Sequence, residues 1–103
     1  MTIVTTETLG DHKLEIIGLV KGSSIMTVHA GKDIMNSLKT LVGGELTSYN
    51  EMMEQARELA TDRMIKQAES LGADAVGAVR YNSSSVAQGA AEVMTYGTAV
   101  RFI

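Results

Sequence analysis

The sequence predicts a single α+β domain of two layers, in which helices cover a sheet of several strands. Three observations lead to this prediction. A long stretch with helical periodicity occupies the middle of the chain, β-branched segments flank it on both sides, and no repeat or interdomain linker interrupts the 103 residues. A chain of this length forms one domain, near the lower end of the size range that buries a real core. Residues 1–103 are therefore expected to fold as one unit.

The central helix is predicted over Ser48–Leu71. Apolar residues recur there every three or four positions, which gives one broad stripe to bury; they are Tyr49, Met52, Met53, Ala56, Leu59, Ala60, Met64, Ala68 and Leu71. Ser48 and Glu51 have the spacing of a capping box, which satisfies two free backbone N–H groups of the first turn. Gly72 stands where a left-handed residue commonly ends a helix.

The chain before this helix is predicted to be mostly extended, with one short helix. β-branched and aliphatic runs favour strands, whereas glycine and serine favour turns. In order, we expect a weak strand at Thr2–Thr6, a stronger strand at Lys13–Lys21, a turn or bulge at Gly22–Ser24, an extended piece at Ile25–Val28 and a short helix at Lys32–Val42 ended by Gly43 and Gly44.

The chain after the helix is predicted to form a β-hairpin. Ala73–Tyr81 contains small and β-branched residues and is expected to be a strand. Asn82–Gly89 is polar and rich in serine, so we expect a flexible loop that joins two strands. Ala90–Ile103 is expected to be the last strand.

Composition excludes several classes of function. The net charge of −3 and pI near 5.3 have the wrong sign for binding nucleic-acid phosphates, and only 4% of the residues are aromatic, which leaves few side chains to stack on bases. The absence of cysteine excludes disulfides, thiolate metal ligands and thiol nucleophiles. No signal peptide and no apolar run of membrane-spanning length is visible, so a cytoplasmic protein without a membrane partner is expected.

The predicted strands carry apolar side chains on both faces. Strict alternation places Leu14, Ile16 and Val20 on one face of a strand and Ile17 and Leu19 on the other, and it separates Val93 from Met94, Tyr96, Val100 and Phe102. Strands of this kind must be covered on both faces, and the helices would cover only one. We therefore expect a homo-oligomer in which copies cover one another. The alternative is that the short helix and the N-terminal strand cover the second face within one chain.

Three charged residues are candidate binding residues. By helical angle, Arg63 lies within the apolar stripe of the central helix, so it is expected to have a carboxylate partner, because an unpaired buried guanidinium is costly. The candidate partners are Glu92, Glu45 and a carboxylate of a neighbouring subunit. Arg80 and Glu92 are expected to face each other across the hairpin. One interpretation is an anion-binding pocket made by Arg63 and Arg80; the other is a structural Arg–Glu network that fixes the register of subunits.

The acidic residues of the central helix lie opposite its apolar stripe; they are Glu51, Glu54, Glu58, Asp62 and Glu69. A hard-cation surface or an acidic docking face is one interpretation. Exposed carboxylates without a convergent cage rarely hold calcium, so a solvated face is the preferred interpretation.

No metal site and no cofactor is predicted. Soft metals favour thiolate, which the chain lacks, and the two imidazoles, His12 and His29, lie far apart in sequence. A ring of subunits would be one way to gather several copies of His29 on a symmetry axis. The preferred interpretation is that neither histidine binds metal.

Seven segments spread over nearly the whole chain resemble the YbjQ-like family; they are Thr5-Thr6, Ile17–Val20, Gly31–Ile34, Leu41–Glu45, Gln55–Ala60, Gly72–Val76 and Tyr96–Val100. The resemblance implies a dodecin-like β-α-β-β subunit, here with extra N-terminal strands and a short helix, and assembly into a ring, usually a pentamer. The family is largely uncharacterised and carries the label "putative heavy-metal-binding". It supplies no agreed catalytic or ligand residues to transfer to this sequence.

Three functions follow from these observations, of which the first is preferred. The first is a non-enzymatic homo-oligomeric ring that binds a small ligand or partner. The second is a metal-binding or stress-response module. The third is an enzyme that uses Arg63, Arg80 and Glu92 on an anionic metabolite.

Overall fold

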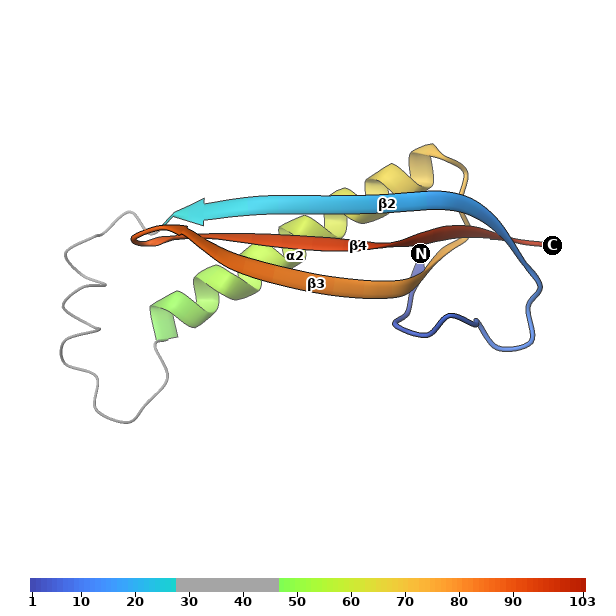
Figure 1. The fold of residues 1–103 in the computed structure, drawn as a ribbon, viewed down its shortest axis with the longest axis horizontal. Coiled ribbons are helices and arrows are strands. Elements are labelled where there is room, and N and C mark those ends of the chain that lie inside the picture. The colour runs from blue at the N-terminus through green and yellow to red at the C-terminus, as the bar shows by residue number, and fades with distance from the viewer. Residues whose placement is uncertain (28–46) are drawn as a thin grey trace.

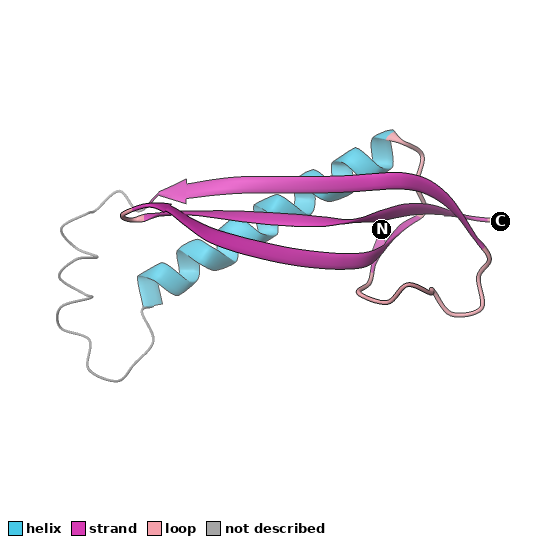
Figure 2. Cartoon of the chain, in the orientation of Figure 1, coloured by secondary structure: helices cyan, strands magenta, loops and turns pink. Residues whose placement is uncertain are grey.

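One long helix lies diagonally across one face of a four-stranded sheet, behind the sheet in the view of Figures 1 and 2. The structure is a computed structural model, which describes residues 1–27 and 47–103. Its principal extents are 55 × 25 × 17 Å and its radius of gyration is 17.0 Å. A compact domain of this length has a radius of gyration of about 13 Å. The fold is thus the predicted α+β class in two layers, drawn out along the strands.

The sheet mixes parallel and antiparallel strands. Its members are β1 (Thr2–Ile3), β2 (Leu14–Thr27), β3 (Ala75–Ala87) and β4 (Ala90–Phe102), in the spatial order β1-β3-β4-β2. The two-residue β1 runs parallel to β3, whereas β4 pairs antiparallel with both of its neighbours. The long strand β2 therefore forms one edge of the sheet. Beyond the short β1, β3 forms the other.

The helix α2 spans Thr47–Ser70, within one residue of the prediction at each end. Its end is a Schellman motif, in which the N–H of Gly72 donates to the carbonyl of Glu69 at 3.0 Å and the N–H of Ala73 donates to that of Ala68 at 3.1 Å. Gly72 has the predicted left-handed conformation, with φ of 76°. The side chain of Ser48, the short helix at Lys32–Val42 and the Gly43-Gly44 stop lie outside the described residues.

The predicted turn at Gly22–Ser24 is wrong, because β2 continues through these residues as one strand of 14 residues. Gly22 is instead the point where α2 comes closest to β2. A Cβ atom there would collide with the carbonyl oxygen of Ala60 and lie 2.5 Å from the backbone nitrogen of Met64. Ser24 confirms the close approach, since its hydroxyl donates to the carbonyl of Ala56 at 2.7 Å. The small residues allow close packing between helix and strand and do not mark a turn.

The predicted loop at Asn82–Gly89 is also wrong over most of its length. β3 continues to Ala87, and only Gln88 and Gly89 connect it to β4. Serines are poor strand formers in isolation, but Asn82 through Ser85 each pair with a residue of β4. The backbone ladder with β4 therefore outweighs the local turn preference of this segment.

The side of the sheet that faces α2 holds most of the core. One cluster joins Val20, Met64, Ala68, Val76, Val79 and Ala99, and a second joins Met52, Met53, Ala56, Ala60, Ala91 and Val93. The helix packs mainly on β2 and β4 and barely touches β3. The half of β3 from Arg80 onward therefore stays exposed on this side as well.

A β-bulge changes which residues of β2 face the helix. The register with β4 shifts between Ile16 and Gly18, so Ile17 is an extra residue in the ladder. Ile17 and Val20 consequently pack on the helix side, while Ile16 and Leu19 are exposed. The predicted assignment, which assumed strict alternation and grouped Val20 with Ile16, is wrong for this reason.

The other face of the sheet, here called the outer face, is only partly covered. The segment after β1 covers one end of it, where Leu9 packs with Ala75 and Val100. The rest carries large apolar side chains in solvent, with Ile16 72%, Leu19 68%, Ile25 60% and Tyr96 39% exposed. The N-terminal segment therefore covers one end of this face within one chain, whereas the short helix, the other part of that alternative, lies outside the described residues.

Residues 1–27 and 47–103 contain no helix that combines the length and the hydropathy needed to cross a bilayer.

Candidate functional site

Arg63 lies at the flank of α2 beside the free edge of β2, and it is exposed. Its Nη1 donates to the carbonyl oxygen of Ser23 at 2.6 Å. Within one chain the predicted burial of Arg63 and its pairing with Glu92 are therefore wrong; Glu45 lies outside the described residues, and a carboxylate of a neighbouring subunit stays a prediction. Because β2 is an edge strand, the backbone carbonyls on its free side pair with no other strand of the sheet. The guanidinium of Arg63 extends beside β2 to one of these carbonyls.

A second side chain of α2 acts on the same edge. The Oε1 atom of Gln67 accepts a hydrogen bond from the backbone N–H of Lys21 at 2.7 Å. Lys21 and Ser23 are two residues apart, so their backbone groups point to the same side of the strand. Arg63 and Gln67 thus satisfy edge groups that would otherwise be open to pairing with another strand.

Arg80 also binds backbone carbonyls. Its Nη1 donates to the carbonyl oxygens of Thr5 and Val79, both at 2.9 Å, and so ties the N-terminal segment to β3. Just before it, Ala78 has φ of 52°, and the register with β4 shifts between Gly77 and Arg80. This irregularity marks the place where β3 loses β1 and becomes an edge strand.

Glu92 does not face Arg80. In the observed register Arg80 lies opposite Tyr96 of β4, whereas Glu92 lies opposite Ser84 of β3 and Ile25 of β2. The predicted cross-strand pair is therefore wrong, because β3 and β4 continue to a two-residue turn at Gln88 and Gly89 where an eight-residue loop was expected, which moves Arg80 four residues along β4 from Glu92. Glu92 is half-buried, and no ion pair joins it to another described residue.

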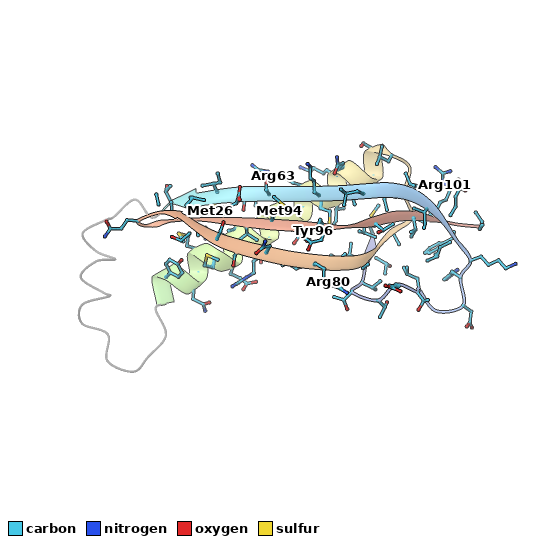
Figure 3. All side chains as sticks on the ribbon, viewed as in Figure 1. Met26, Arg63, Arg80, Met94, Tyr96 and Arg101 are labelled. Atoms are coloured by element: carbon cyan, nitrogen blue, oxygen red, sulfur yellow. The ribbon has the colours of Figure 1, made fainter. Side chains whose placement is uncertain are left out.

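One copy of the chain does not bring the two candidate arginines together. Figure 3 shows Arg63 beside β2 and Arg80 beside β3, on opposite edges of the sheet. A pocket shared by both would need two copies. The binding role assigned to Arg63, Arg80 and Glu92 stays a prediction.

A groove lies between α2 and the exposed half of β3, with a volume of about 580 Å³; we call it the acidic groove, and it is lined by Glu54, Arg57, Glu58, Thr61, Asp62 and Tyr81. The hydroxyls of Thr61 and Tyr81 are hydrogen-bonded at 2.7 Å and close its floor. Arg57 forms an ion pair with Glu54 at 3.0 Å. Glu58 and Asp62 have no cationic partner among the described residues. The acidic helix face was visible in the sequence, but the groove was not, because it depends on how far β3 extends beyond α2.

The described residues of one chain contain no group of three histidine, cysteine, aspartate or glutamate side chains placed to hold an ion. The ring of His12 stacks on that of Phe102 at 4.2 Å between centroids, which gives this histidine a packing role. His29 lies outside the described residues. The thioethers of Met26, Met52 and Met53 share one apolar cluster, where methionine serves as core filler.

Comparison with known proteins places the chain in a family. A family model named YbjQ_1 and described as "Putative heavy-metal-binding" matches residues 1–103. A UPF0145 protein from Clostridium novyi (strain NT) is 54% identical over 103 residues, which cover 100% of both chains. A UPF0145 protein from Thermotoga petrophila is 52% identical over 102 residues, covering 98% of this chain and 96% of its own length.

A solved structure shares the fold. It is a protein of unknown function from Pediococcus pentosaceus ATCC 25745, assigned to the DUF74 family, with a TM-score of 0.69 and 19% identity over 100% of this chain and 98% of that one. At this identity the likeness supports the α+β fold alone. The family model and the close relatives together show that the chain belongs to the uncharacterised YbjQ family, also called UPF0145, whose model describes a putative heavy-metal-binding domain.

Proposed function

We propose that the chain is the subunit of a non-enzymatic homo-oligomeric ring, a pentamer by its family resemblance, that binds a small ligand or partner in the cytoplasm. The outer face of the sheet carries this proposal, because Ile16, Leu19 and Ile25 are each at least 60% exposed. Full burial of one such side chain contributes about 1.5–3 kcal/mol, so leaving all three in water is costly. Several large apolar side chains exposed on one face of a small domain commonly mark an interface.

The dimensions of the molecule also support an assembly. The chain exposes 6754 Å² of surface, whereas a compact monomer of 11.0 kDa exposes about 5,600 Å². The excess comes with an elongated shape, two long edge strands and a sheet covered by a helix on one side only. Such a shape suits a subunit that packs against copies of itself.

The expected result of placing charge on the outer face is dissociation. Leu19→Glu combined with Ile25→Glu should reduce the particle mass to the 11.0 kDa of a single chain, because two carboxylates would have to be buried between copies. Both side chains are exposed in the single chain, so its circular dichroism should be unchanged. Light scattering during gel filtration measures the mass.

The matched control for this double variant is Leu71→Glu, which charges a leucine that is 45% exposed directly after α2 and does not belong to the sheet. It should leave the mass unchanged. An unchanged mass for the double variant at the outer face would contradict the proposal. If the double variant dissociates as expected, a thermal-shift screen on the unmodified, assembled protein would identify the class of ligand.

The family description favours a second candidate, a metal-binding or stress-response module. Calorimetry with Zn²⁺, Cu²⁺ and Ni²⁺ tests it, and micromolar binding by the metal-free protein would support it. The enzymatic alternative has less support, because Arg63 and Arg80 lie on opposite edges and each binds a backbone carbonyl.

A further inference from the structure

The two edges of the sheet differ in what pairs with their backbone. On β2, the side chains of Arg63 and Gln67 bond to backbone groups of the edge. On β3, the N-terminal segment pairs with the strand only as far as Val79. Residues 81–85 of β3, which we call the open edge, pair in an unbroken register with β4 and with no other described strand. Backbone N–H and C=O groups on one side of the open edge are therefore available to a further strand.

The open edge carries none of the features that discourage strand pairing. Edge strands are commonly protected by charged side chains, by proline or by bulges. The sequence of the open edge is Tyr-Asn-Ser-Ser-Ser, so it has neither charge nor proline, and all of its side chains are exposed. The register irregularities of β3 lie before and after it, between Gly77 and Arg80 and between Ser85 and Ala87. A segment of this kind accepts an added strand from a binding partner.

The acidic groove lies where an added strand would place its side chains. In the view of Figure 1, the first half of α2 projects past the free edge of β3, so a strand added to that edge would lie over this part of the helix. Tyr81 of the open edge points to the helix side, because its hydroxyl is bonded to that of Thr61. An added strand would lie about 4.8 Å from β3 and would direct every second side chain to the same side, into the groove.

The acidic groove has an excess of negative charge. Its lining holds three carboxylates and one guanidinium. The guanidinium of Arg57 pairs with Glu54. Glu58 and Asp62 form no ion pair with another described residue. Lys66 follows Asp62 by one turn of α2, but it does not line the groove and does not pair with that carboxylate. Side chains that enter the groove are therefore expected to be cationic.

We propose that the open edge binds an extended peptide of a partner protein as an additional strand, and that lysine or arginine at alternate positions of this peptide enters the acidic groove. The inference rests on the proposed function, because it names the chemical class of the partner that the assembly binds. Backbone hydrogen bonds to the edge supply affinity, and the groove selects basic side chains. The exposed ring of Tyr81 offers such a cation an aromatic face. The groove lies on the helix side of the sheet, so the outer face stays free for copies of the chain.

A synthetic peptide tests whether a strand is added. The probe is a capped peptide of alternating threonine and lysine, and fluorescence anisotropy of an attached label measures its Kd for the unmodified protein. Two further versions carry backbone N-methyl groups, one on every lysine and the other on every threonine. Alternate N–H groups of an extended strand point to opposite sides, so each version loses the donors of one side only. One version should bind about tenfold or more weakly, and the other should bind like the probe.

Variants of the protein test whether the lysines enter the groove. Glu58→Gln with Asp62→Asn should weaken binding of the probe by about tenfold, because two exposed ion pairs are lost. The matched control is Asp11→Asn with Glu69→Gln, which removes the same charge from two exposed carboxylates outside the groove lining. It should leave the Kd unchanged. The difference between the two variants should shrink as salt screens the ion pairs, and circular dichroism checks that the helix is intact.

Three results would overturn the inference. Equal binding of the two methylated versions would show that the peptide does not extend the sheet. An equal Kd for the groove variant and its control would show that the lysines do not enter the groove. A fall in particle mass on addition of the probe would show that a second copy already occupies the open edge.

The inference and the proposed ring fail in different ways. An assembled protein that does not bind the probe would overturn the inference and leave the ring. A particle of 11.0 kDa that binds the probe with the expected pattern would contradict the ring and support the peptide site.

Discussion

Gly22→Ala should destabilise the protein by about 3 kcal/mol or more, because the added methyl group has no space. Its Cβ would collide with the carbonyl oxygen of Ala60, lie 2.5 Å from the nitrogen of Met64 and lie 3.0 Å from the Cβ of Arg63. Two of these atoms belong to the backbone of α2 and cannot rotate away. The helix would have to lift from β2, which separates Val20 from Met64 in the core.

Urea unfolding followed by circular dichroism, at a fixed protein concentration, measures this effect. The control is Gly10→Ala, where φ is +58° and no atom lies within 4 Å of the added Cβ. The control carries only the conformational penalty of a left-handed residue, about 1 kcal/mol. Equal effects of the two substitutions would show that α2 does not approach β2 at Gly22.

Met64→Ala should cost about 3 kcal/mol, within the range for removing a long apolar side chain from a core. Met64 is the largest fully buried side chain of the described core. It packs with Val20 and Val76, and its sulfur lies 3.8 Å from the hydroxyl oxygen of Thr95, which is also buried. Truncation therefore removes contacts to β2, β3 and β4 at once and leaves a cavity between the layers.

Met64→Leu is the matched variant, since it keeps the volume and loses only the flexible thioether; it should cost less than about 1.5 kcal/mol. The urea midpoints of the two variants, multiplied by a common m-value, give the difference between their free energies of unfolding. A cost for Met64→Ala no larger than that for Met64→Leu would place Met64 outside the core.

Local patterns predicted the elements that are stabilised locally. The apolar period and Gly72 located α2 to within one residue, and the last strand ends one residue from its predicted end. Both elements are long, and each has clear boundaries in the sequence. The α+β class followed from their order along the chain.

The wrong predictions share a cause, because each depended on packing or pairing with another element of the fold. Gly22 was interpreted as a turn, but it is small because α2 passes over it. The serines after Asn82 were interpreted as a loop, but β4 holds them in a strand. The extra residue at Ile17 reverses which residues of β2 face the helix after it, and no local sequence pattern indicates this bulge.

The candidate site was predictable only in its residue types. Arg63 was recognised as out of place on an apolar stripe, yet its partner is a backbone carbonyl, which no side-chain pattern reveals. The expected facing of Arg80 and Glu92 failed because the strands continue to a two-residue turn where the sequence indicated a loop, which places Arg80 opposite Tyr96. The acidic face of the helix could be predicted from the sequence. The groove beside it could not, because it depends on how far β3 extends past α2.

The mass of the unmodified protein in solution tests the central claim most directly, which is that copies of the chain cover the outer face of the sheet. Light scattering across a hundredfold range of concentration should give one particle several times heavier than 11.0 kDa, and about 55 kDa for five copies. A constant mass of 11.0 kDa up to the highest concentration would contradict the account.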